Sequence, residues 1–254
     1  ILGIILFFIK DFSWLLDGYA LIFCAICLIT TGIVIKHLIK IKAQNARSKV
    51  SYKEILRVSF PMSFSLITLL MMQSFDVFIL ETYWSFNEVA FYGAAIKITT
   101  GIGIILATIN AVIAPDISRL FVLEDYKTLK NLIVKSTMLN FYLTVPVILV
   151  ILFFSEEILV LFGEEYVNGN TALIIMVVAQ MFNAFCGSVG VYLNMTGRQK
   201  VYLYILSIAL VINIVLNLSL IPKYGMSGAA IATGISMIFW NITGVIYIYI
   251  KDRI

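Results

Sequence analysis

Charged residues are scarce in this chain. Only 13% of its 254 residues are Asp, Glu, Lys or Arg, whereas a soluble globular domain carries roughly 25%. Because a soluble domain needs charge to cover its surface, this shortage argues against soluble enzymes and soluble binding modules. Hydrophobic residues make up 61% of the chain and its mean hydropathy is +1.02. The composition therefore indicates a protein whose surface faces lipid.

Residues with catalytic or metal-binding chemistry are also few. The single histidine, His37, lies in a basic stretch, which leaves almost no material for a His-based site. Cys24 and Cys27 have a C-x-x-C spacing, but they stand in an apolar run; we interpret them as packing residues, with a redox or zinc pair as the alternative. The sequence contains neither a Gly-rich phosphate loop nor a nucleophile elbow. We expect no enzyme and no cofactor.

Long apolar runs recur along the chain, and a bilayer core about 30 Å thick requires roughly 20 such residues per helix. They predict an all-α bundle of transmembrane helices. Pro61 and Pro146 should kink two of them, and Pro222 should end another. Ile1–Ile9 has the composition of a helix end, so we expect the chain to be part of a longer protein. The predicted spans are Tyr19–Ile35, Val58–Leu80, Val89–Ile113, Leu132–Phe154, Ala172–Met195, Val201–Ile221 and Gly228–Ile250.

Basic residues predict the orientation of these spans, because Lys and Arg collect on the cytoplasmic side. Of the 18 Lys and Arg residues, Lys10 and Lys223 lie on one side, Lys97 lies within a span, and all others lie on the opposite side. The basic stretch 36–57 and the C-terminus are therefore predicted to be cytoplasmic. We expect this stretch to contact membrane lipid and not nucleic acid.

The same stretch divides the chain into predicted domains. Residues 1–35 would end one lobe, with about one and a half helices; residues 36–57 would be a linker; and residues 58–254 would form a six-helix lobe. Two connections, Pro115–Asn131 and Ser155–Asn170, are amphipathic and are predicted to be packing segments at the membrane surface.

Short motifs follow one another in a recognisable order. They are Arg57-Val-Ser-Phe-Pro61, Glu88-Val-Ala-Phe-Tyr-Gly-Ala-Ala95, Ala114-Pro-Asp-Ile-Ser118, Leu161-Phe-Gly-Glu-Glu-Tyr166, Gly197-Arg198, Asn213-Ile-Val-Leu-Asn217, Leu220-Ile-Pro-Lys-Tyr-Gly225 and Gly228-Ala-Ala-Ile-Ala-Thr233. Their order resembles the C-terminal part of bacterial polysaccharide flippases of the O-antigen and capsule type, in the multidrug/oligosaccharidyl-lipid/polysaccharide exporter superfamily. Ala114–Ser118 is read as the end of the second helix of the lobe.

The resemblance implies two six-helix lobes around a central cavity that opens alternately to each membrane face. It also implies transport of oligosaccharide linked to undecaprenyl diphosphate, from the cytoplasmic to the outer leaflet of the bacterial plasma membrane, alongside other glycan-assembly proteins. Three alternatives stay open: a drug/cation antiporter of the same superfamily, a membrane enzyme that polymerises glycans, and a non-transporting component of glycan assembly.

Ionisable groups within a span require a reason, because each costs at least about 2.5 kcal/mol on insertion scales. Lys97 is interpreted either as part of a cationic cavity wall that holds a diphosphate or as the partner of Asp76 on the neighbouring helix. Further candidates for the substrate cavity are Gln180, Asn183 and Arg57.

Asp76 has a second set of candidate partners. Asn213 and Asn217 are four residues apart and share a helix face, and Thr233 lies in the following span. Carboxylate, amide and hydroxyl oxygens suit a small hard cation, and the resemblance implies coupling to Na⁺ or H⁺. The sequence thus suggests a monovalent cation site and no other metal; hydrogen bonding between helices is the alternative.

Overall fold

The computed structural model of the chain describes residues 25, 29, 30, 32 and 52–252. The chain divides into two compact units, Ile1–Ser51 and Tyr52–Ile254, and the fold described below is that of the second. The predictions for Ile1–Ile9, Cys24 and Cys27, almost all of Tyr19–Ile35, and most of the basic stretch lie outside the described residues.

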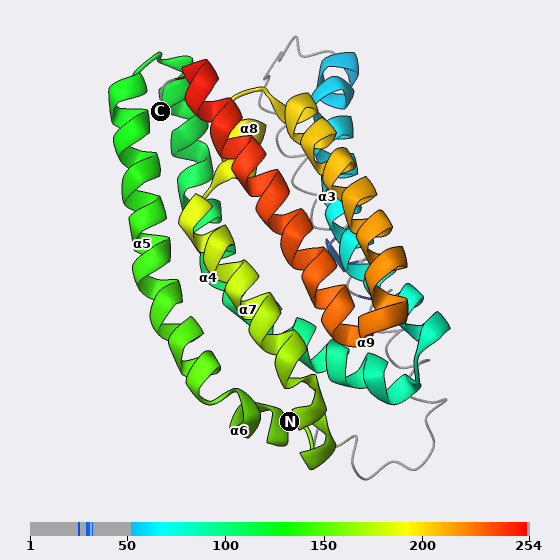
Figure 1. Cartoon of the computed structure of the whole chain (residues 1–254). Helices are drawn as coiled ribbons and strands as arrows, with labels where there is room; N and C mark the ends of the chain where they lie inside the picture. The colour runs from blue at the N-terminus through cyan, green and yellow to red at the C-terminus, as the bar shows by residue number, and fades with distance from the viewer. Residues whose placement is uncertain (1–24, 26–28, 31, 33–51, 253–254) are drawn as a thin grey trace. The chain divides into compact units, whose positions relative to one another are not determined.

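The second unit is a bundle of long helices, and no strand occurs in its described residues (Figure 1). Among the described residues, five helical segments are long and apolar enough to cross a membrane. α9 turns back on itself at Gly225 and crosses twice, so these segments make six crossings, as the lobe prediction required. The elements are α3 (Tyr52–Tyr83), α4 (Phe86–Val122), α5 (Tyr126–Phe153), α6 (Ser155–Val160), the 3₁₀ helix η1 (Glu164–Gly169), α7 (Asn170–Cys186), α8 (Val189–Met195) and α9 (Gln199–Asp252).

Polarity in this unit is distributed in the opposite way to that of a soluble domain. Large apolar side chains cover the outside: Tyr142 and Phe153 on α5 and Val112 on α4 are each at least 70% exposed. Asn140, Asn213 and several other polar side chains are instead fully buried. Apolar surface of this extent is stable against acyl chains, and the protein is a multi-pass membrane protein.

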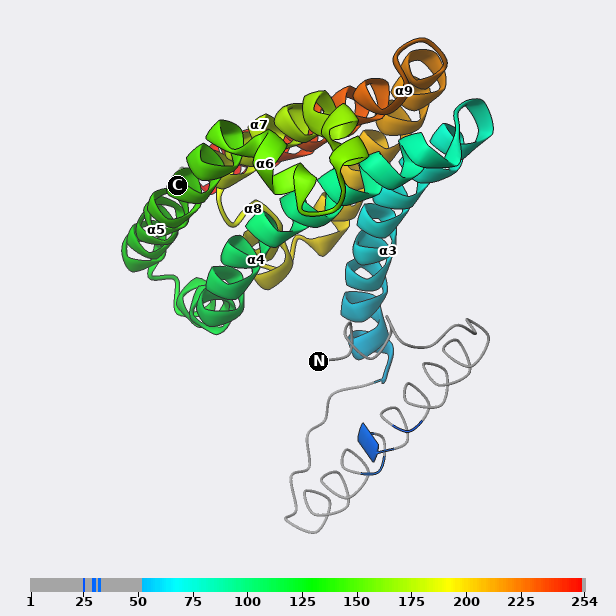
Figure 2. The same ribbon diagram turned by 90° about the horizontal axis from the view of Figure 1, so that it is seen from below.

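Successive turns alternate between the two ends of the bundle (Figures 1 and 2). At one end the α3–α4 turn meets the turn of α9, where the indole Nε1 of Trp84 donates a hydrogen bond to the carbonyl oxygen of Ile221 at 2.8 Å. At the other end Arg198 approaches the end of α4 and the end of α9. Basic residues of the α4–α5 turn, the α8–α9 turn and the end of α9 therefore gather at one end, as the antiparallel spans predicted.

The end of the second span of the lobe was predicted wrongly. Ala114–Ser118 was expected to close that helix, but α4 continues through Pro115 to Val122 and α5 begins at Tyr126. An internal proline removes one backbone hydrogen bond. Burial of Ile117 and Leu120 on the inner face of the extra turns offsets this loss, since each side chain is at most 8% exposed.

The predicted span Ala172–Met195 is broken. α7 ends at Cys186, Gly187 adopts a positive φ of 67°, and α8 begins two residues later. A break within a membrane leaves backbone groups without their helical partners. The amide Nδ2 of Asn140 on α5 donates to the carbonyl oxygen of Ala184 at 3.2 Å, which satisfies one of them.

The turn of α9 requires glycine at two positions. Gly225 has φ 54° and ψ −135°, a conformation almost restricted to glycine. A Cβ on Gly228 would lie 2.6 Å from the carbonyl oxygen of Leu220. Because this obstacle is backbone, it cannot move aside as a flexible side chain would. The break falls at Gly225, a little beyond the predicted stop at Pro222.

Gly228→Ala is therefore expected to destabilise the protein by about 2 kcal/mol through overpacking of the turn. Gly101→Ala in α4 is the matched control, because no atom lies within 4 Å of the added Cβ, and it should be neutral or slightly stabilising. Thermal unfolding of the purified protein in detergent measures the stability of both variants. Equal melting temperatures for the two variants would show that the α9 turn has room for a side chain.

Candidate functional site

Asp76 places a carboxylate inside the helix bundle. It lies on α3, and only 1% of its surface is exposed. Three donors reach it from other helices. The Nδ2 of Asn217 donates to Oδ1 at 2.5 Å, the hydroxyl of Tyr92 donates to Oδ2 at 2.9 Å, and the hydroxyl of Thr233 also donates to Oδ2. The group thus joins α3, α4 and both arms of α9.

Asn213 completes this polar group. Its Oδ1 accepts a hydrogen bond from Asn217 Nδ2 at 3.1 Å, and its Nδ2 donates to the hydroxyl of Thr233 at 3.4 Å. The two asparagines are fully buried and Thr233 is 9% exposed. The structure therefore brings together Asp76, Asn213, Asn217 and Thr233, the residues that the sequence suggested for a coupling cation.

Tyr92 belongs to the same group and was missed in the sequence. An aromatic residue in an apolar helix is usually a packing residue, so the residue type did not indicate a role in the site. The position of Tyr92 could have indicated it, because Asp76 and Tyr92 stand equally far before and after Trp84 in the α3–α4 turn. In an antiparallel helix pair, such residues lie at the same depth.

The predicted pair between Asp76 and Lys97 is wrong. Among the described residues no ion pair joins Lys97 to Asp76, and Lys97 is exposed. Lys97 follows Tyr92 by five residues, which carries it about 7.5 Å further along α4 and about 140° around it. Its ammonium group consequently points away from the buried carboxylate.

One oxygen of the site lacks a partner. Asn217 Oδ1 is buried and accepts no hydrogen bond from any described residue. Rotation of the amide by 180° exchanges its oxygen and nitrogen. This rotation would place Oδ1 beside the Asp76 carboxylate and Asn213 Oδ1, where a proton or a cation would pair the three oxygens. With one formal negative charge, the site suits a monovalent ion better than a divalent one.

The other predicted residues lie elsewhere. Gln180 and Asn183 on α7 are half-buried and bonded in series: Gln180 Nε2 donates to the Thr99 carbonyl at 3.5 Å, and Asn183 Nδ2 donates to Gln180 Oε1 at 3.1 Å. Asn241 Nδ2 on α9 donates to Asn183 Oδ1 at 3.1 Å. This chain of amides joins α7 to α4 and α9. Arg57 is exposed near the start of α3.

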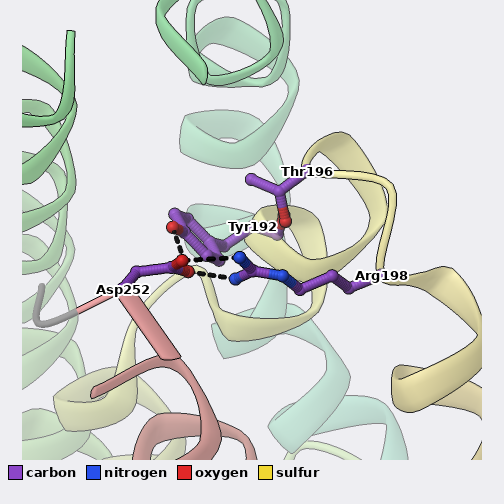
Figure 3. A network of polar contacts seen from close by, with 4 residues as sticks. All are labelled: Tyr192, Thr196, Arg198 and Asp252. Atoms are coloured by element: carbon purple, nitrogen blue, oxygen red, sulfur yellow. Dashed lines mark hydrogen bonds and ion pairs between the residues drawn. The ribbon is translucent and has the colours of Figure 1, made fainter. Parts of the chain in front are cut away.

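A second polar group lies at the opposite end of the bundle (Figure 3). The guanidinium of Arg198 makes two hydrogen bonds to Asp252, one of them 2.5 Å from Nη2 to Oδ1, and the Tyr192 hydroxyl donates to Asp252 Oδ2 at 2.7 Å. The guanidinium carbon also lies 5.6 Å from the ring centre of Phe121 and 5.9 Å from that of Tyr247. Hydrogen bonding to Asp252 raises the pKa of Arg198, so it stays charged while it joins α4, α8 and α9.

The fold and the site define a multi-pass α-helical membrane protein with a charged group enclosed between its helices. The chain belongs to the MatE family, whose sequence pattern matches residues 61–219.

Named relatives share this part of the chain. A putative O-antigen transporter of Shigella flexneri is 32% identical over 166 residues, covering 65% of this chain and 39% of that protein. The capsular polysaccharide biosynthesis protein CapF of Staphylococcus aureus is 26% identical over 260 residues, covering 100% of this chain and 65% of CapF. The chain thus spans less than two thirds of either relative.

Solved structures share the fold. A crystal structure of a MATE point mutant superposes with a TM-score of 0.73 at 18% identity, over 82% of this chain and 49% of that one. A MOP superfamily transporter from Pyrococcus furiosus superposes with a TM-score of 0.69 at 20% identity, over 78% of this chain and 45% of that one. This chain therefore corresponds to about half of a MATE transporter fold.

Proposed function

We propose that this protein takes part in moving lipid-linked oligosaccharide across the membrane, as a transporter and not as an enzyme. The observation that carries this proposal is the similarity to the putative O-antigen transporter at 32% identity. The similarity to CapF along the whole chain supports the same class of substrate. The substrate would be an oligosaccharide repeat unit on undecaprenyl diphosphate.

The proposed setting is the bacterial plasma membrane, with residues 36–57 and the C-terminus in the cytoplasm. The clustering of described basic residues at one end of the bundle supports this orientation, because positively charged ends stay on the cytoplasmic side. Lys97, Gln180, Asn183 and Arg57 remain candidates for contact with the substrate.

Coupling to a cation is the second part of the proposal. Asp76, Asn213, Asn217 and Thr233, with the hydroxyl of Tyr92, would hold a Na⁺ ion or a proton. A bound ion would neutralise the carboxylate and pair the free oxygen of Asn217. Since these groups come from α3, α4 and both arms of α9, occupancy of the site would favour the arrangement of helices seen here over one in which they separate.

Disruption of the gene that encodes this chain is expected to remove glycan from the cell surface and to cause lipid-linked repeat units to accumulate. Surface glycan is measured by immunoblot and the lipid-linked pool by mass spectrometry; the intact gene supplied in trans should restore both. Susceptibility to cationic drugs is the control, because a drug antiporter would change it. Altered drug susceptibility with normal surface glycan would refute glycan transport in favour of drug export.

A further inference from the structure

A cavity lies in the half of the bundle nearer to Arg198. Its volume is about 190 Å³, and it is enclosed by α3, α4, the broken α7–α8 segment and α9. Tyr202 lines it and is one helical turn from Arg198, to whose carbonyl its backbone N–H donates at 3.1 Å. The wall includes Leu66, which is 60% exposed, so the cavity reaches the surface of the unit beside α3. It shares no residue with the Asp76 site.

Two amides in this cavity lack partners. Asn110 on α4 and Asn194 on α8 line it, and neither side chain makes a hydrogen bond to any described residue. The Oδ1 atom of each is buried. Buried polar groups in native proteins are nearly always paired, and an unpaired one calls for a ligand or an ordered water. A turn of either amide presents its oxygen to the cavity as an acceptor or its nitrogen as a donor.

An aromatic wall stands beside these amides. The Trp240 and Tyr202 rings meet edge to face, with centroids 6.0 Å apart at 71°, which orients the indole. Tyr202 is itself fixed against the backbone of α8, because a Cβ on Gly190 would lie only 2.6 Å from its hydroxyl oxygen. Trp240 thus adds an oriented aromatic side chain to the cavity wall.

Charge is missing from the wall of this cavity, which contains no Asp, Glu, Lys, Arg or His among its described residues. Neither an organic cation nor a phosphate would find a counter-charge there. Amide groups that exchange hydrogen bonds with hydroxyls, beside an aromatic face that packs on C–H groups, match a neutral polyhydroxylated ring.

We propose that this cavity binds one neutral sugar ring of the transported glycan. The proposal rests on the proposed function for the identity of the glycan, but the binding itself is testable without transport. The hydroxyl groups of the sugar pair the amides of Asn110 and Asn194, and the ring packs on Trp240.

The test is titration of the purified full chain, in nanodiscs of phosphatidylethanolamine and phosphatidylglycerol, with the methyl glycosides of glucose, galactose and N-acetylglucosamine. At least one should change tryptophan fluorescence saturably, with a Kd on the order of millimolar, and the change should be lost in Trp240→Phe. Fully O-methylated methyl glucoside has the same ring without hydroxyl donors and should have no effect.

Asn110→Leu and Asn194→Leu should each weaken glycoside binding at least tenfold without lowering the melting temperature, because the replaced amides have no partners to lose. Thr144→Val is the matched control: it removes a buried hydrogen bond to Asn140 Oδ1 outside the cavity, so it should lower the melting temperature and leave glycoside binding unchanged. If Asn110 and Asn194 had only a structural role, their replacement by leucine would lower the melting temperature and leave glycoside binding unchanged.

Absence of saturable binding by all three glycosides, or equal binding of the O-methylated compound, would overturn the proposal and leave water as the occupant. A saturable response to tetraphenylphosphonium alone would overturn it as well. If sugars fail to bind while gene disruption still removes surface glycan, the subsite is wrong and the transport function stands. If sugars bind but surface glycan is independent of the gene, the transport function is wrong and the sugar site stands.

Discussion

Asp76→Asn is expected to abolish the response of the protein to cations while leaving it folded. Asparagine keeps the shape of the side chain, and its oxygen can still accept hydrogen bonds from Tyr92 and Thr233. Its Nδ2 then donates to the oxygen of Asn217 after that amide turns by 180°, but the side chain carries no charge to hold an ion. The variant also removes a buried charge that has no ion-pair partner among the described residues, so its stability should be equal to or greater than that of the wild type.

The measurement is thermal unfolding of the purified protein in detergent, with Na⁺ replaced stepwise by choline and repeated over a pH series. A ligand at 100 times its Kd stabilises the state that binds it by about 2.7 kcal/mol, so Na⁺, or acid if the ion is a proton, should raise the melting temperature of the wild type. Asp76→Asn and Asn217→Ala should lose this increase. In the cell they should also reduce surface glycan.

The control for this experiment is Asp116→Asn. Asp116 is half exposed and pairs with Arg119 on the same helix, so its loss should leave the response to Na⁺ and pH intact. A wild-type melting temperature that is indifferent to both ions would remove the cation site from the proposal and leave the polar group as a set of interhelical hydrogen bonds.

Asp252→Asn is expected to give the largest loss of stability, about 3 kcal/mol. The side chains of Arg198 and Asp252 are only 15% and 6% exposed. Removal of the carboxylate leaves the guanidinium between Phe121 and Tyr247 without its anion, and the Tyr192 hydroxyl loses its charged acceptor. Ends of α4, α8 and α9 would be joined less tightly.

Chemical unfolding of the purified variants measures this effect. Asp116→Asn again serves as control, because breaking an exposed pair should cost less than about 1 kcal/mol. The double variant Arg198→Met, Asp252→Leu should regain most of the lost stability, since apolar side chains can replace a buried ion pair. Equal stability of Asp252→Asn and Asp116→Asn would show that the pair contributes little.

The membrane spans could be predicted from the sequence because they depend on local composition. Apolar runs and the sidedness of Lys and Arg located them without knowledge of any contact. The Asp76 group could also be anticipated, since Asn213 and Asn217 share a helix face by spacing alone and an ionisable residue within a span requires partners.

Features that depend on tertiary contacts could not be predicted in the same way. The break at Gly187 packs against Thr137 on α5, where a Cβ would lie 2.2 Å from the hydroxyl oxygen. Continuation of α4 past Pro115 depends on burial of Ile117, and the Arg198–Asp252 pair joins residues 54 apart in the chain. None of these has a local signature.

The turn of α9 has a consequence for the length of the chain. Asn217 and Thr233 stand equally far before and after Gly225, so the two arms face each other at the depth of Asp76 only if no residue is gained or lost between them. A single inserted residue would rotate Thr233 by about 100° and displace it by about 1.5 Å along its arm. Apart from the two glycines that the turn requires, Gly225 and Gly228, this connection should tolerate changes in residue type more readily than changes in length, unlike ordinary surface loops.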